Sequence, residues 1–151
     1  MGDKKLKDVL INIKGTQSSD GENETLEMIT VGKLGKRNGN YYLTYPECDE
    51  NGMEGVTTML KIDKNQSVVL QRSGDVHSRM LIEKNRRNIS HYDTGFGGMM
   101  VGIFGESVRS TIKDDGGELF MRYTVDINSS YTSTNEISIS VREAASGGCQ
   151  N

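Results

Sequence analysis

The residues best placed to do chemistry are charged side chains that strand alternation turns toward an interior. In segment 68–72 the apolar phase ends on Arg72, and in segment 41–47 the phase that carries tyrosines also carries Glu47. An inward cation without a partner would be very costly, so we expect Arg72 to meet Glu47 directly or through a bridging group.

These two residues should reach the same end of the fold. They lie at the ends of predicted strands that run the same way in a meander, with one strand between them, roughly 10 Å apart at ~4.8 Å per step. Two interpretations stay open: a structural ion pair that closes one end of a barrel, or a site that anchors an anion at the mouth of a cavity. The candidate cluster at this mouth comprises Tyr45, Glu47, Thr58, Arg72, Tyr92, Thr94 and Tyr123.

Methionine is plentiful, and Met80 and Met121 fall on inward faces by alternation. Flexible, polarisable methionine fills irregular gaps in a core, and it also suits an adaptable lining for an apolar ligand. We treat these two residues as candidate cavity lining.

The other conspicuous residues lack the partners that a site requires. His77 and His91 are the only histidines, and no convergent cluster accompanies them. The glycine run at 95–98, continued by Gly102 and Gly105, lacks the Lys-Ser/Thr of a phosphate loop and a following helix, so we expect backbone bends. Two distant cysteines make neither a zinc site nor a disulfide framework. We expect no catalytic residue, metal or cofactor.

The elements that must position the cluster are strands. Alternation with period two recurs between turn signals such as Asn38-Gly39 and Asp114–Gly117, and no stretch keeps the helical period over three turns. A meander of short strands would leave exposed edges unless it closed. The sequence therefore predicts an all-β protein, a closed antiparallel barrel of about eight to ten strands, with a β-sandwich as the alternative. The ten predicted strands lie near residues 9–13, 26–31, 41–45, 56–62, 67–72, 76–82, 89–94, 99–112, 119–127 and 136–141.

Composition indicates one domain over residues 1–143, followed by a disordered tail at 144–151. The net charge is −3, and the densest basic cluster, around Arg86 and Arg87, falls in a predicted hairpin turn where we expect it to be solvated. Nucleic-acid binding normally needs a basic face, so we expect no such partner. We also expect no signal peptide, no membrane association and a reducing cytoplasmic setting.

Four segments are similar to a known family. Residues 42–47, 69–74, 92–95 and 119–123 resemble the YwiB-like family of uncharacterised bacterial β-barrel proteins, a domain of unknown function in the calycin-like group. The resemblance runs from about Val9 to Val141, and Pro46 departs from the family pattern. It implies a calycin-like, lipocalin-like barrel in a cytoplasmic bacterial protein, and it assigns no activity and no site residues.

Together these features favour a non-enzymatic barrel that binds a small molecule in its interior or mouth. The first alternative is a structural or protein-interaction module with a packed interior. The second is an enzyme that uses the Glu47, Arg72 and tyrosine cluster. The sequence leaves the ligand and the oligomeric state open and allows a dimer.

Overall fold

The computed structural model describes residues 6–47, 55–64, 67–74, 77–93 and 98–144, and these form ten strands and no helix. The all-β prediction is therefore confirmed. Within these described segments there is no helix long and apolar enough to cross a membrane. The predicted 144–151 tail lies outside the described residues apart from Ala144. The strands are β1 Lys7–Ser19, β2 Glu22–Arg37, β3 Asn40–Pro46, β4 Val56–Asp63, β5 Ser67–Gly74, β6 Ser78–Glu83, β7 Arg87–Asp93, β8 Gly98–Ser110, β9 Gly116–Ile127 and β10 Ser130–Glu143.

All ten strands belong to one antiparallel sheet in the order β6-β5-β4-β3-β2-β1-β10-β9-β8-β7. Every step is between consecutive strands except the pairing of β1 with β10, which joins the first and last strands through a long ladder. The meander prediction is confirmed, and the two ends of the sheet are β6 and β7, which follow each other in the chain.

The sheet curls until these two ends meet, which makes a nearly closed barrel. At this seam Lys84 bridges to Gly105 of β8, and the Asn85 amide donates to the Gly105 carbonyl at 2.8 Å. The Gly105 amide in turn donates to the carbonyl of Arg86 at 3.2 Å. The sequence predicts a hairpin between β6 and β7. In the structure β6 pairs with β5 and β7 pairs with β8, so their connection forms the seam instead.

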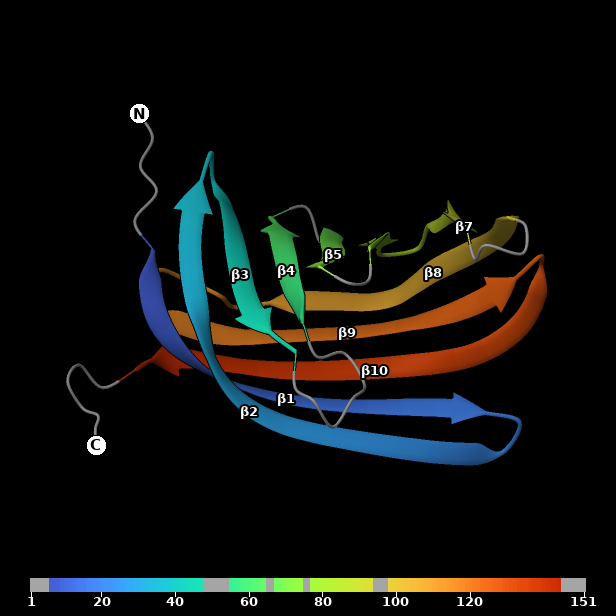
Figure 1. The fold of residues 1–151 in the computed structure, drawn as a ribbon, viewed down its shortest axis with the longest axis horizontal. Helices are drawn as coiled ribbons and strands as arrows, with labels where there is room; N and C mark the ends of the chain where they lie inside the picture. The colour runs from blue at the N-terminus through green and yellow to red at the C-terminus, as the bar shows by residue number, and fades with distance from the viewer. Residues whose placement is uncertain (1–5, 48–54, 65–66, 75–76, 94–97, 145–151) are drawn as a thin grey trace.

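The strands differ in length, and this difference shapes one end of the barrel. β1, β2, β8, β9 and β10 span 12–16 residues, whereas β3 to β6 span 6–8. Figure 1 shows that the long strands continue past the short ones, and we call these continuing parts of the long strands the band. β2 pairs with β1 from Glu22 to Leu34, but with β3 only from Lys33 to Arg37. β2 therefore leaves the short strands as it enters the band.

The bend in β2 depends on Gly32. A Cβ atom at this position would lie 2.3 Å from the Thr44 carbonyl oxygen and 2.7 Å from the Ile11 side chain, so only glycine fits there. Gly32 therefore lies at a bend within one continuous strand. The adjacent β2–β3 hairpin turns through Asn38 and Gly39, both with positive φ, as the Asn-Gly signal indicates.

The interior holds one continuous apolar core. The inward phases predicted for β5 and β9 are those observed, because Leu70 and Met121 are both buried. Core residues come from β1 to β6 and β8 to β10, and in β1 and β10 the apolar phase stops where the strands enter the band. The core thus occupies one part of the barrel and leaves space toward the other end.

Candidate functional site

A cavity of about 600 Å³ lies between the core and the band of long strands. Its buried lining is mostly apolar, and its exposed lining comes from β1 and β2. The apolar lining consists of Ile13, Leu26, Met28, Leu60, Leu70, Met121, Ile137 and Ile139, and the polar lining includes Gln17, Glu24, Tyr45, Glu47, Arg72, Tyr123 and Asn135.

Four of these residues, Tyr45, Glu47, Arg72 and Tyr123, form a polar wall of the cavity. Strand register brings two of them together through Thr58, since Tyr45 pairs with Thr58 across β3–β4 and Thr58 pairs with Arg72 across β4–β5. Glu47 follows the end of β3 at Pro46, and its amide donates to the Val56 carbonyl at 2.9 Å, which holds the carboxylate beside β4.

Arg72 and Glu47 meet as predicted. Arg72 Nε lies 3.7 Å from Glu47 Oε2, and the Thr58 hydroxyl donates to the same oxygen at 2.5 Å. The Glu47 side chain is 5% exposed and that of Arg72 is 25% exposed. The contact is therefore an ion pair between a buried carboxylate and a partly exposed arginine side chain.

The Nε–H group of Arg72 is an unsatisfied hydrogen-bond donor within the wall. It is buried, and among the described residues it has no hydrogen-bond partner. A separation of 3.7 Å from Glu47 is too long for a hydrogen bond. An unsatisfied buried donor costs roughly 1–3 kcal/mol. Burial also keeps Nε itself out of reach of a bound molecule, so a ligand would contact the exposed quarter of the Arg72 side chain.

The tyrosines of the wall supply phenol groups. Tyr45 and Tyr123 are both buried. Burial, and next the nearby Glu47 carboxylate, raise the pKa of the Tyr45 phenol well above its usual range. Tyr45 therefore stays protonated at neutral pH and can donate a hydrogen bond. The wall thus combines a cation, a carboxylate and phenols around an apolar cavity.

The remaining predicted residues divide into three groups. Met121 is buried and lines the cavity, while Thr58 is fully buried and supports Glu47. Met80 packs against the core and is not among the residues that line this cavity. Tyr92 belongs to β7, where it pairs with Met99 of β8, and Thr94 lies outside the described residues.

Sequence reasoning missed the part of the site that comes from the band. Gly15 and Gln17 continue the inward phase of Ile13 on β1, and Asn135 pairs with Gln17. The signal was present, because these positions keep the period of two while changing from apolar to polar. Such a change marks the place where a strand leaves the core and borders open space.

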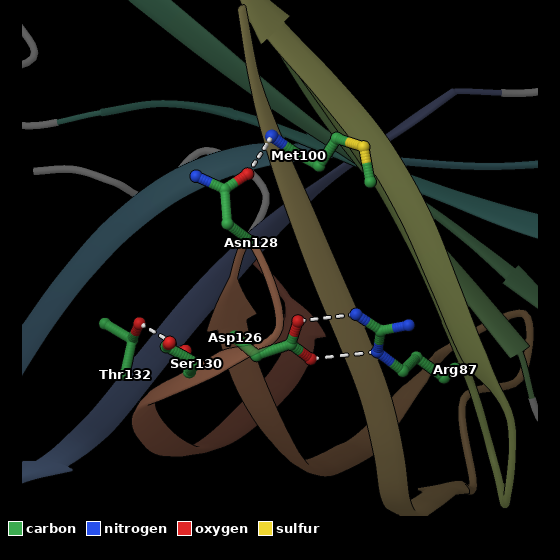
Figure 2. A network of polar contacts seen from close by, with 6 residues as sticks. All are labelled: Arg87, Met100, Asp126, Asn128, Ser130 and Thr132. Atoms are coloured by element: carbon green, nitrogen blue, oxygen red, sulfur yellow. Dashed lines mark hydrogen bonds and ion pairs between the residues drawn. The ribbon is translucent and has the colours of Figure 1, made fainter.

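A second polar network lies on another part of the barrel. Arg87 donates to both carboxylate oxygens of Asp126, from Nε at 2.9 Å and from Nη2 at 2.6 Å (Figure 2). The guanidinium crosses Gly102, where a Cβ atom would lie 2.6 Å from Arg87 Nε. The basic cluster expected to be solvated therefore contributes one specific ion pair, and Gly102 makes room for it. Asn128 accepts a hydrogen bond from the Met100 amide nearby at 3.3 Å.

The described residues contain no group of three or more histidine, cysteine or acidic side chains placed to hold a metal ion. The chemistry that the cavity visibly offers is hydrogen bonding, charge pairing and apolar contact.

Comparison with known proteins agrees with this architecture. The family model described as "Domain of unknown function (DUF1934)" matches residues 11–139. The uncharacterized beta-barrel protein YwiB of Bacillus subtilis (strain 168) is 24% identical over 119 residues, which are 79% of this chain and 82% of that protein. The crystal structure of the ywiB protein from Bacillus subtilis has the same fold, with a TM-score of 0.79 and 22% identity over 94% of this chain and 96% of that one. Since the family model spans the barrel from β1 to β10, this chain belongs to the DUF1934 family of domains of unknown function.

Proposed function

We propose that this protein binds a small molecule in the barrel cavity, with the apolar part of the ligand against the core and a hydrogen-bond acceptor on Arg72. The observation that carries the proposal is the cavity of about 600 Å³ with the polar wall on one side. Ligand sites typically occupy about 300–1,000 Å³ and combine an apolar lining with a few placed polar groups.

The charge of the wall constrains the polar end of the ligand. Glu47 and Arg72 carry opposite charges 3.7 Å apart, so the pair is close to neutral as a unit. A neutral carbonyl or amide group therefore suits the wall, since it can accept from Arg72 and the tyrosines. A carboxylate would gain from Arg72 but would also approach Glu47, so we expect it to bind more weakly than an amide of the same shape.

The test uses matched ligands and a variant that blocks the cavity. The ligands are small aromatic or branched aliphatic carboxamides, the acids of the same carbon skeleton, and the hydrocarbons without the polar group. Thermal shift and native mass spectrometry report binding, because a ligand that binds only the folded state raises its stability. We expect the carboxamides to give the largest shifts.

Gly15 offers the blocking variant. A Cβ atom at Gly15 would meet only the Glu136 carbonyl oxygen, at 3.8 Å, so a side chain can be added there without a backbone clash. Gly15→Phe should fill part of the cavity and abolish ligand binding, whereas Gly15→Ala should retain it.

The contribution of Arg72 is tested by Arg72→Met against Arg79→Met, which removes an exposed arginine from the neighbouring strand β6. We expect at least a tenfold loss of affinity for the first variant and none for the second. Equal binding by Gly15→Phe and the unchanged protein, or no binding by any ligand of the panel, would contradict the proposal.

A further inference from the structure

The N-terminal part of β2, residues Glu22–Val31, has a free edge within the part of the chain that the structure describes. These residues pair with β1 on one side, and none of the described residues pairs with them on the other. Figure 1 shows this part of β2 along the border of the band, away from β3. An unpaired edge presents a row of backbone donors and acceptors that can take up another strand.

Of the devices that usually protect such a strand, the free edge has charged side chains, its three glutamates, but not the others. It contains no proline and no lysine, and its register with β1 runs without a bulge. It also exposes apolar side chains on both faces: Ile29 is 69% exposed, Val31 56% and Leu26 44%. At about 3.3 Å per residue, ten residues give roughly 30 Å of edge, enough for a strand of typical length.

The charge on the free edge selects among the strands that could pair with it. Glu22, Glu24 and Glu27 lie on it, and no basic residue does. Glu27 faces Lys14 across the β1–β2 pair, but Glu22 and Glu24 face Ser19 and Gln17. A second copy would bring two such acidic edges together, whereas a basic strand would neutralise one.

We infer that the free edge of β2 binds an extended peptide in which basic and apolar residues alternate, by adding it to the sheet as an eleventh strand. This interaction goes beyond the proposed small-molecule binding and uses a surface that only partly overlaps the cavity. The two meet at Glu24, Leu26 and Met28, which also line the cavity. Side chains on the inward face of the added strand would therefore lie at the open side of the cavity.

The experiment measures the binding of fluorescein-labelled heptapeptides by anisotropy. One peptide alternates lysine and leucine, the second replaces every lysine by glutamate, and two more carry N-methyl groups on alternate amides, so that each blocks one edge of the peptide. We expect the lysine peptide to bind at least tenfold more tightly than the glutamate peptide and to weaken as salt rises. One N-methylated peptide should lose at least tenfold in affinity while the other retains it.

Charge-reversal variants locate the site. Glu22→Lys combined with Glu24→Lys should weaken the lysine peptide at least tenfold. Glu118→Lys is the matched control, because Glu118 is exposed on β9, a strand that is paired on both sides. We expect that control to change the affinity by less than twofold.

Hydrogen exchange on the free protein decides whether the edge is open. Alternate amides of Glu22–Val31 that point away from β1 should exchange rapidly and should slow when the peptide is added. Protection of these amides in the free protein would overturn the inference, as would equal binding of all four peptides. If protection appeared only at concentrations where sedimentation shows a dimer, the occupant would be a second copy. Failure of the unchanged protein to bind the lysine peptide, with carboxamide binding intact, would overturn this inference and leave the proposed function standing.

Discussion

At the scale of single residues, the polar wall shows how a barrel tolerates an inward charge. Glu47 is nearly fully buried, yet Thr58 donates to it and Arg72 lies 3.7 Å away. The cation of the pair is placed where a quarter of it still reaches solvent. This arrangement compensates the carboxylate and leaves the guanidinium able to contact a ligand.

Replacing Arg72 by methionine should destabilise the protein, because the buried Glu47 carboxylate loses its cation. We expect a loss of about 2–3 kcal/mol in the free energy of unfolding, less than the ~3–5 kcal/mol of a fully buried pair because Arg72 is partly solvated. The double variant Arg72→Met with Glu47→Gln should recover part of this loss. Urea denaturation measures both, and a double variant no more stable than the single one would contradict a coupled pair.

The ion pair between Arg87 on β7 and Asp126 on β9 predicts how the stability of the fold depends on pH. Hydrogen bonds from Arg87 lower the pKa of the Asp126 carboxyl from its usual 3.8. A lowered pKa stabilises the folded state above the usual pKa, and that contribution is lost as the pH falls through the lower, folded-state value. Asp126→Asn should therefore be less stable than the unchanged protein at pH 7, and the difference should shrink below about pH 4.

Chemical denaturation at neutral and acidic pH checks this prediction. Asp20→Asn, in the turn between β1 and β2, removes a carboxylate outside the network and serves as the control. A destabilisation by Asp126→Asn that stayed constant down to pH 2 would show that the ion pair is not its cause.

At the scale of elements, closure of the barrel depends on Gly105. A Cβ atom there would lie 2.2 Å from the Glu83 carbonyl oxygen and 2.7 Å from its carbon, so β8 can approach the end of β6 only without a side chain. The backbone bonds of Gly105 with Asn85 and Arg86 need the same approach. The glycines of β8 therefore have separate roles, Gly105 in the seam and Gly102 under Arg87.

Gly105→Ala should open the seam, because the clash is with backbone that cannot move aside without separating β6 from β8. We expect a destabilisation of about 1–3 kcal/mol, as for other overpacked sites. Gly15→Ala is the matched control, since its new methyl group meets nothing closer than 3.8 Å. That variant should be neutral or more stable by about 0.5–1 kcal/mol, as alanine is less costly to order than glycine. Equal losses in the two variants would show that the seam has no special role.

At the scale of the whole molecule, the single sheet has two parts with different roles. The short strands β3–β6 and the matching parts of the long strands close around the core, while the rest of the long strands forms the band. The cavity lies where these two parts meet, and the free edge of β2 borders it. Both proposed binding surfaces thus arise from one property, the unequal length of the strands.

The absence of helix among the described residues predicts a circular dichroism spectrum of pure β type. Saturation of the protein with a cavity ligand should leave this spectrum unchanged, because such binding does not require refolding of the barrel. A helix content near one third, the average for globular proteins, would contradict the architecture.

Local rules were sufficient for the strands, their inward faces and the contact between Arg72 and Glu47. Alternation decides which side chains share a face, and a meander decides which strand ends meet. Both depend only on neighbours along the chain. For the same reason the Asn38-Gly39 turn and the Met121 lining follow directly from the order of residues.

Closure, strand length and the free edge depended on contacts between distant segments. The β6–β7 connection reads as a hairpin, but Gly105, some twenty residues on in the chain, holds it as a seam. The C-terminal end of β1 and the N-terminal end of β10 are polar and show no apolar alternation. They form strands because they pair with each other, as at Gln17–Asn135 and Ser18–Thr134. Whether a strand edge is paired is likewise a property of the assembled sheet. The free edge of β2 follows from that sheet, in which β3 pairs with β2 only from Lys33 onward.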